Sequence, residues 1–324
     1  MSIKLDIKDK KILYELDMDA RQSISSIAKR VGLSKEVVNY RIRRMEKEGL
    51  IDGYYAIIEY SKLGYMYCRL IMTLQNISPK EEEEIREYAK KSKKIGLIVT
   101  AAGEWWDLVF VIWAKNIIEI KEVLDDFMLK YGKFIKEKEI TIATKVYHFR
   151  HKYLYNNDDS TCLVVEQSKK EVKIDSKDLK ILEILSKEGR KEITEIAKIL
   201  KTTINTVKYR LKKLLDNNII VGFRANININ ILEYQRYKVM LLLYNIDKNI
   251  MKKIIYFLGN EKNIVYITEA VGRSDLEFEI DVKNINELYE IMKKIRTKFS
   301  EVIKDHKLGL TLKEEGINYL PTTG

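Results

Sequence analysis

The sequence is short of features that would place a protein outside the cell or in a membrane. It has only two cysteines among 324 residues, Cys68 and Cys162, and they form neither a disulfide framework nor a CxxC metal motif. No apolar run reaches roughly 18 residues, the length that a membrane-spanning helix needs. The chain also opens without a charged and then apolar leader. We therefore expect a protein of the reducing cytoplasm that does not enter a membrane.

Motifs of catalysis and cofactor binding are missing as well. The sequence has no glycine-rich nucleotide loop, no metal-ligand spacing and no nucleophile elbow. The expectation is a protein without cofactor or metal and without enzymatic activity.

What the sequence has instead is a long internal repeat. Gly103 recurs as Gly272, 169 residues later, and Asp107 recurs as Asp275, 168 residues later. Solenoid repeats have periods of roughly 20–50 residues, so this repeat is a duplicated unit. Each copy can therefore carry a function of its own, and the two copies together can carry a further one.

The charge of the chain is unbalanced. Lysine and arginine number 59 against 48 aspartate and glutamate residues, a formal net charge of +11. This excess favours an anionic partner such as nucleic acid. It could equally reflect the lysine-rich composition of the whole chain, so it needs support from a motif.

The first part of each copy has the pattern of a helix-turn-helix. In copy 1 we expect helices over about 7–17, 24–30 and 34–48, with Gly32 in the tight turn before the third. In copy 2 the third helix spans about 203–217, and Lys201 replaces the turn glycine. A left-handed conformation at a non-glycine residue costs on the order of 1 kcal/mol, so we expect the second turn to be either slightly strained or differently shaped.

The outer face of both third helices is basic and polar. Arginine and lysine can neutralise phosphates or reach guanine, and asparagine can pair with an adenine edge. A single basic face is usually only solvated, but two copies, each after a turn and a cap, favour DNA binding with different half-sites. The predicted DNA contacts are Ser34, Lys35, Asn39, Tyr40, Arg41, Arg43 and Arg44 in copy 1, and Thr203, Asn205, Thr206, Lys208, Tyr209, Arg210, Lys212 and Lys213 in copy 2.

The second part of each copy alternates strands and helices in the order β-α-β-β-α-β, which is the plan of a ferredoxin-like domain. The predicted fold class is therefore α+β, a tandem repeat of a winged-type helix-turn-helix and a ferredoxin-like domain. The expected strands are 65–75, 95–101, 106–114 and 137–147 in copy 1, and 236–246, 263–270, 276–282 and 302–312 in copy 2.

This order of elements resembles the leucine-responsive/asparagine-regulator (Lrp/AsnC) family of transcription regulators. The matching motifs include Leu5-Asp-x-x-Asp9, Val31-Gly-Leu-Ser34, Leu63-Gly64-Tyr65 and Gly103-x-x-Trp-Asp107. The resemblance covers nearly the whole chain, once per copy, and copy 2 diverges more. It implies a sequence-specific regulator of double-stranded DNA whose ferredoxin-like domains form dimers that assemble further.

The resemblance also implies that the ferredoxin-like domains sense a small molecule, usually an amino acid, near the glycine turn. The residues in question are Gly103, Trp106, Asp107, Gly272 and Asp275. A glycine turn could offer N–H groups to a carboxylate, and an aspartate could meet an ammonium. Alternatively, Gly103 only makes the hairpin and Asp107 only caps it. Ser274 replaces Trp106 in copy 2, so the two pockets cannot be equivalent.

The duplication itself predicts that the two copies pair inside one chain as a pseudo-dimer. A tether raises the effective concentration of the second half, and the operator need not be palindromic. Alternatively, each half pairs with its twin in another chain. The expected segments are helix-turn-helix 1–53, ferredoxin-like domain 54–150, linker 151–172, helix-turn-helix 173–222 and ferredoxin-like domain 223–320.

An enzyme of the same fold is the alternative function. Siroheme decarboxylases look like this regulator family, and the resemblance implies that they grip an acidic tetrapyrrole with arginine and histidine. His148, Arg150 and His151 could form such a cluster, but the segment after each helix-turn-helix supplies only Arg224. A non-DNA-binding assembly protein is a third option, favoured if the basic helices are buried at an interface.

Overall fold

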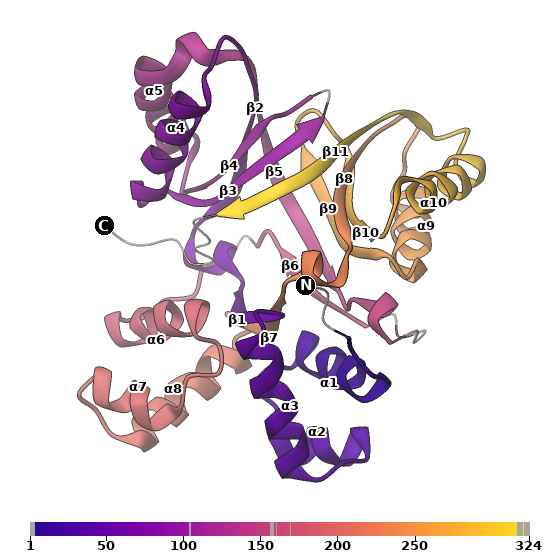
Figure 1. Ribbon diagram of the computed structural model, residues 1–324. Helices are drawn as coiled ribbons and strands as arrows, with labels where there is room; N and C mark the ends of the chain where they lie inside the picture. Colours follow the sequence, from indigo (N-terminus) through magenta and orange to yellow (C-terminus); the bar gives the residue numbers. More distant parts are fainter. Residues whose placement is uncertain are drawn as a thin grey trace. The chain divides into compact units, whose positions relative to one another are not determined.

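The computed structural model describes residues 4–103, 105–155, 159, 161–168, 170–315 and 320, and groups the chain into two compact units (Figure 1). We call residues 1–59, 148–165 and 172–234 the helix-turn-helix unit, and residues 60–147, 166–171 and 235–324 the sheet unit. Each unit contains material from both copies. Among the described residues, no helix is long and apolar enough to cross a membrane.

The helix-turn-helix unit contains two three-helix motifs, close to the predicted positions. Copy 1 supplies α1 (Ile7–Met18), α2 (Ile24–Val31) and α3 (Lys35–Lys47), and copy 2 supplies α6 (Ser176–Lys187), α7 (Ile193–Ile199) and α8 (Ile204–Asp216). Asp6 and Asp175 begin α1 and α6 with capping boxes, and Ser34 and Thr203 cap α3 and α8. Val38, Ile42 and Met45 form an apolar stripe along α3 and are buried.

The turns between the second and third helices differ between the copies. Gly32 has φ +69° and Lys201 has φ +48°, so both occupy the left-handed region. Lys201 thus adopts the same left-handed conformation as Gly32, its equivalent in copy 1, at a small cost in conformational free energy.

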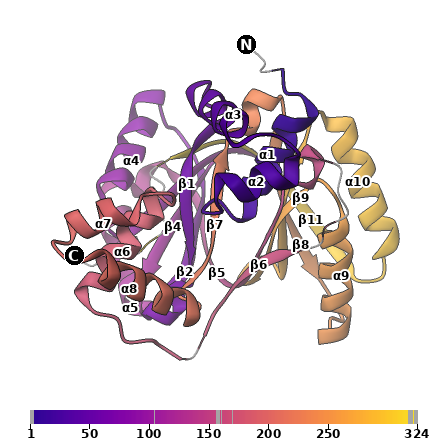
Figure 2. The ribbon, with the colours of Figure 1, turned by 90° about the horizontal axis from the view of Figure 1, so that it is seen from below.

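A two-stranded antiparallel ladder joins the two motifs. β1 (Ile51–Ile58) pairs with β7 (Ile220–Ile227), with Tyr55 directly opposite Arg224. Since these two residues are repeat equivalents, the ladder is pseudo-symmetric about that pair. Helix α1 packs against β7, and α6 packs against β1, so each motif rests on the strand of the other copy. Figure 2 shows β1 and β7 side by side between α1–α3 and α6–α8.

The sheet unit contains two ferredoxin-like copies, as predicted. Copy 1 consists of β2 (Met66–Leu74), α4 (Pro79–Lys91), β3 (Ile95–Gly103), β4 (Leu108–Ala114), α5 (Ile117–Tyr131) and β5 (Ile135–Phe149). Copy 2 consists of β8 (Gln235–Leu243), α9 (Lys248–Asn260), β9 (Ile264–Val271), β10 (Leu276–Val282), α10 (Ile285–Lys298) and β11 (Ile303–Glu315). The apolar side chains of β2 and β4 that point toward α4 and α5 form one core with those helices.

The two copies share a closed sheet. The strand order is β2-β4-β3-β11-β8-β10-β9-β5, and β5 also pairs with β2, which closes the circle. β3 pairs with β11, and β9 neighbours β5, so both junctions join copy 1 to copy 2. In Figure 1, α4 and α5 lie outside the strands of copy 1, and α9 and α10 lie outside those of copy 2. The copies therefore pair within this one chain.

Short elements complete the fold. Four 3-10 turns occur at Tyr60–Leu63, Gly132–Phe134, Lys152–Leu154 and Ile229–Leu232 in the described part of the chain. The stretch that we expected as a linker, 151–172, contains one of these turns and β6 (Cys162–Glu166), which extends the sheet beside β5. It is therefore partly built into both units.

Candidate nucleic-acid interface

The third helix of copy 1 presents a polar surface to solvent. Tyr40 has 67% of its surface exposed, and Lys35 and Arg43 are exposed beside it, while Asn39 is half-buried. The three apolar residues of the opposite face are buried against α1 and α2, which orients the helix. The geometry leaves cations, an amide and a phenol hydroxyl free to approach phosphates and base edges.

The third helix of copy 2 presents the equivalent surface with different chemistry. Tyr209, the repeat equivalent of Tyr40, is 70% exposed, and Asn205, Lys208, Lys212 and Lys213 are exposed. Thr206 is half-buried and shares a hydrogen bond with the capping Thr203. The predicted contact residues of each copy thus lie on one helix and its cap, and the arginines among them that are ion-paired within the protein are described next.

Arg41 and Arg210 lie at the edge of this surface and are held by aspartates of the first helices. Arg41 donates to Asp6 at 2.7 Å and to Asp9 at 2.8 Å. Arg210 donates in the same way to Asp175 and Asp178, both at 2.7 Å. Arg44 also donates to Asp9, at 2.7 Å. These arginines tie the third helix of each copy to the N-terminus of the first helix, and the spacing of residues along the third helix alone does not reveal such partners.

We expect Arg210→Met to lower the free energy of unfolding by about 1–2 kcal/mol, because the buried Asp178 loses its charged partner at a partly exposed pair. The exposed Lys212→Met should change the free energy of unfolding by less than about 0.5 kcal/mol. Urea denaturation measures both. Loss of DNA affinity by Arg210→Met at unchanged stability would instead make Arg210 a DNA contact.

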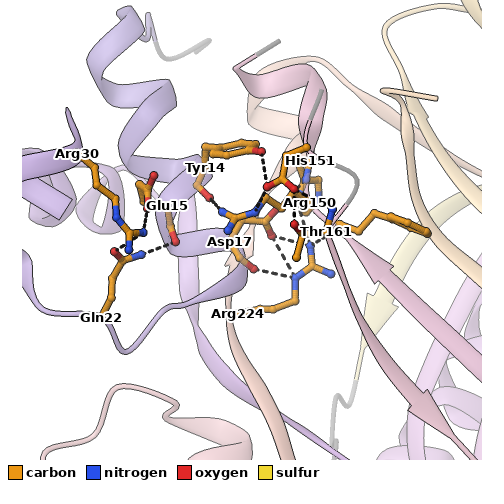
Figure 3. A network of polar contacts seen from close by, with 11 residues as sticks. Tyr14, Glu15, Asp17, Gln22, Arg30, Arg150, His151, Thr161 and Arg224 are labelled. Carbon is orange, nitrogen blue, oxygen red and sulfur yellow. Dashed lines mark hydrogen bonds and ion pairs between the residues drawn. The ribbon is translucent and has the colours of Figure 1, made fainter. Parts of the chain in front are cut away.

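A buried ion cluster joins the two copies near the end of α1, and sequence reasoning missed it (Figure 3). We call Asp17, His151 and Arg224 the Asp17 cluster. Arg224 donates to one Asp17 carboxylate oxygen from Nη2 at 2.6 Å and from Nε at 3.1 Å. The other oxygen accepts from the backbone N–H of His151 at 2.6 Å and lies 3.0 Å from its Nδ1. The signal in the sequence was the replacement of Tyr55 by Arg224 at an equivalent strand position.

Burial and charge set the protonation of this region. Burial opposes the charged carboxylate of Asp17, but the Arg224 guanidinium and the His151 ring outweigh it and hold its pKa below the ordinary value. Burial, with help from Arg224, lowers the pKa of His148 to about 3. Arg150 donates to the carbonyl of Tyr14 at 2.6 Å and is ion-paired with Asp159. His151 and Arg150, which the enzyme alternative requires, are thus bonded to other residues of the protein, and His148 is held neutral.

Backbone contacts further fix the two motifs to each other. Ala20 N–H donates to the carbonyl of Phe223 at 3.0 Å, and its repeat equivalent, Gly189, donates to the carbonyl of Tyr54 at 2.6 Å. Arg21 donates to the carbonyl of Gly189 at 2.7 Å. A Cβ at Gly189 would lie 2.7 Å from the backbone nitrogen of Tyr55, which explains the glycine at this close approach. The spacing of α3 and α8 is therefore set by hydrogen bonds and not by a loose tether.

The glycine-turn residues have structural partners in both copies. The Asp107 carboxylate accepts from the Leu74 N–H at 2.7 Å, and Asp275 accepts from the Leu243 N–H at 2.8 Å. Trp106 is 1% exposed and packs against Gly309. Gly103 and Gly272 are exposed at the ends of β3 and β9. Each aspartate thus bonds to the backbone at the end of a neighbouring strand, β2 or β8, and a bulky ring occupies the turn of copy 1.

Within the described residues, no three His, Cys, Asp or Glu side chains are grouped as a metal site requires. The arrangement offers two exposed polar helices and buried ion pairs, which suits recognition of a polyanion.

Comparison with known proteins agrees with this arrangement. A winged helix-turn-helix DNA-binding family model matches residues 5–52 and 174–221. An HTH-type transcriptional regulator of Pyrococcus furiosus, described as uncharacterized, is 33% identical over 144 residues, which are 44% of this chain and 93% of that protein. The HTH-type transcriptional regulator LrpA of Pyrococcus horikoshii is 30% identical over 131 residues, 40% of this chain and 87% of that protein. Each relative thus corresponds to one copy.

Solved structures of one enzyme are similar over nearly the whole chain. The siroheme decarboxylase NirDL matches with a TM-score of 0.64 and 13% identity, covering 95% of this chain and 91% of that one. At this identity the likeness concerns the fold alone.

Proposed function

Because the chain belongs to the Lrp/AsnC family of helix-turn-helix transcription regulators, we propose that it regulates transcription by binding a bipartite operator with both halves of one polypeptide. The observation that carries the proposal is the pair of exposed, unlike helices α3 and α8 on one hydrogen-bonded ladder. We propose further that it acts in the cytoplasm and that these pseudo-dimers assemble into larger oligomers. Membership of the Lrp/AsnC family supports both proposals.

The chemistry of the two surfaces supports a division of roles. Exposed lysines such as Lys213 neutralise phosphates, which gives affinity without sequence preference and a strong dependence on salt. Asn39 supplies an amide that can pair with adenine, so it contributes specificity. Because Glu36 of α3 is replaced by Asn205 in α8, the two helices read different half-sites.

This division predicts two different mutant phenotypes on duplex DNA selected by the protein from a random pool. Asn39→Ala is expected to reduce the difference in binding free energy between the selected site and a mismatched site by about 1–3 kcal/mol. Lys213→Ala is expected to weaken all duplexes alike and to reduce the slope of affinity against salt by about one. Fluorescence titration at several salt concentrations measures both. Identical behaviour of the two variants would contradict the assignment.

A small effector, such as an amino acid, is proposed to act on the sheet unit. Membership of the Lrp/AsnC family supports an effector. Gly103 and Gly272 are exposed at the ends of strands, where such a ligand is expected. Trp106 and Ser274 make the two turns unequal, so copy 2 has the smaller side chain at this position. Adding single amino acids to the DNA titration checks the role, and an affinity that none of them changes would contradict it.

An enzyme acting on a tetrapyrrole is the second candidate, favoured by the likeness to the NirDL fold. Gripping an acidic tetrapyrrole needs available cations. Here Arg224 and His151 are bonded to Asp17, and burial keeps His148 neutral at ordinary pH. We therefore propose a regulator without enzymatic activity. A change in the visible absorbance of iron-uroporphyrin on adding the protein would contradict this choice.

A further inference from the structure

Two buried ion clusters take their opposite charges from different copies of the repeat. The Asp17 cluster lies in the helix-turn-helix unit, with its acid from copy 1 and its arginine from copy 2. The second cluster lies in the sheet unit, with its arginine from copy 1 and its acid from copy 2. Copy 1 therefore supplies the acid of the first cluster and the arginine of the second, and copy 2 supplies the opposite charge in each.

The second cluster consists of Arg69, Lys238, Ser274 and Glu277, and we call it the Glu277 cluster. Arg69 donates to both carboxylate oxygens of Glu277, from Nη2 at 2.8 Å. Lys238 lies 3.1 Å from the same carboxylate, and Ser274 donates to it at 2.6 Å. Burial raises the cost of the charged carboxylate, but Arg69 and Lys238 outweigh it and lower the pKa of Glu277 to about 2.

Neither cluster has an ionic twin at the pseudo-symmetric position. The equivalents of Asp17 and Arg224 are Ser186 and Tyr55, both buried and neutral. The equivalents of Glu277 and Arg69 are Val109 and Lys238, and Val109 packs in an apolar cluster with Ile71, Ala101, Trp106 and Met240. Each cross-copy cluster therefore exists once, although the surrounding fold exists twice.

Pairing of copy 2 with itself would bury unpaired arginines. In a symmetric ladder the residue on the two-fold axis faces its own twin. Arg224 sits at that axis, opposite Tyr55, and is 0% exposed. Two copies of copy 2 would place two Arg224 side chains opposite each other, with Ser186 in place of the aspartate. Burying uncompensated charges disfavours this pair strongly.

Pairing of copy 1 with itself is disfavoured in both units. Asp17 would face Tyr55 without a guanidinium, and Arg69 would face Val109 without a carboxylate. Both side chains are almost completely buried, so solvent could not compensate them. The mixed pair alone neutralises both clusters.

We propose that the buried faces of the two copies select each other as partners, and that the covalent link between the copies is not what prevents self-pairing. The partner that fits copy 1 is a copy-2 surface with a buried arginine on its ladder strand and a buried glutamate on its central strand. By the same chemistry, each half excludes single-copy regulators that lack these charges. The proposal is independent of DNA binding.

The test uses the full chain with a protease site inserted after Lys170, an exposed residue between β6 and α6. The folded protein is cut, and cut samples with natural and heavy isotopes are mixed, unfolded in urea and returned to buffer. Native mass spectrometry then separates complexes of 1–170 with 171–324 from complexes of two like fragments. We expect the mixed pair to exceed either self-pair by about a hundredfold, because each self-pair leaves buried charges uncompensated.

The matched control is the cut chain with Asp17→Ser, Arg224→Tyr, Arg69→Met and Glu277→Val, which removes the acid and the arginine of both clusters. Its self-pairs should rise to the abundance of the mixed pair. Equal abundance of self-pairs and mixed pairs in the unsubstituted chain would overturn the proposal. So would failure of the cut chain to recover the mixed pair in a buffer where the uncut chain refolds.

A second measurement does not depend on refolding. Tagged 1–170, untagged 1–170 and 171–324 are produced together in one cell, and the tagged fragment is retrieved. The proposal expects the retrieved 171–324 to equal the sum of tagged and untagged 1–170, since every copy of one fragment is paired with the other even where these pairs assemble further. Retrieval of 1–170 in excess over 171–324 would contradict it.

Discussion

Asp17→Ala is expected to lower the free energy of unfolding of the helix-turn-helix unit by about 3–5 kcal/mol, because it leaves a buried guanidinium without its counter-charge. Arg224 is 0% exposed and makes three of its hydrogen bonds to Asp17, two to the carboxylate and one to the backbone carbonyl. The carboxylate also accepts from the backbone N–H of His151. Urea denaturation followed by helical circular dichroism measures the change.

The repeat supplies a matched control for this substitution. Ser186 occupies the equivalent position in copy 2, and its hydroxyl donates to the carbonyl of Glu183 three residues earlier. Ser186→Ala should therefore cost about 1 kcal/mol or less. The double variant Asp17→Ser with Arg224→Tyr copies the neutral pair of the other side and should recover most of the lost stability. Equal effects of Asp17→Ala and Ser186→Ala would contradict the importance of the ion cluster.

Inserting five base pairs between the two half-sites of the operator is expected to weaken binding by about a hundredfold or more. Half a helical turn rotates one half-site to the opposite face of the duplex, and one recognition helix then loses its contacts. The ladder of β1 with β7 and the bonds from Ala20 and Gly189 hold the two motifs at one spacing. Fluorescence titration of spaced duplexes measures the loss.

A ten-base-pair insertion separates a fixed spacing from a flexible tether. It restores the face of the duplex but moves the half-sites about 34 Å further apart, a distance that the hydrogen-bonded ladder cannot follow. We therefore expect a loss similar to that of the five-base-pair insertion. Recovery of affinity at ten base pairs would show that the motifs move independently.

The sequence predicted most of the fold because each element depends on local patterns. Helices predicted over 34–48 and 203–217 match α3 and α8 within a residue at each end, because Val38, Ile42 and Met45 recur at helical spacing and Ser34 and Thr203 can cap the helices that follow them. In the ferredoxin-like copies the alternation of apolar residues placed every strand within a few residues of its observed bounds; 276–282 matched β10. The repeat also predicted that the copies pair within the chain, which the closed sheet confirms.

The missed features depend on contacts between distant parts of the chain. Asp17 and Arg224 are 207 residues apart, and neither residue carries a local pattern that names its partner. Arg41 and Arg210 sit on the polar side of their helices, but bonds to the first helices hold them, and helical spacing does not report such partners. The same is true of Trp106, whose burial follows from its contact with Gly309 on a strand of the other copy.

The most direct test of the central claim is selection of duplex DNA from a random pool by the intact protein, with sequencing of the winners and a salt titration on the best one. The account predicts one enriched motif made of two unlike half-sites about one helical turn apart, with affinity that falls steeply with salt. A palindromic motif would contradict the reading of different half-sites by α3 and α8. The absence of any enriched sequence, with weak binding at physiological salt, would contradict the claim that this chain is a DNA-binding regulator.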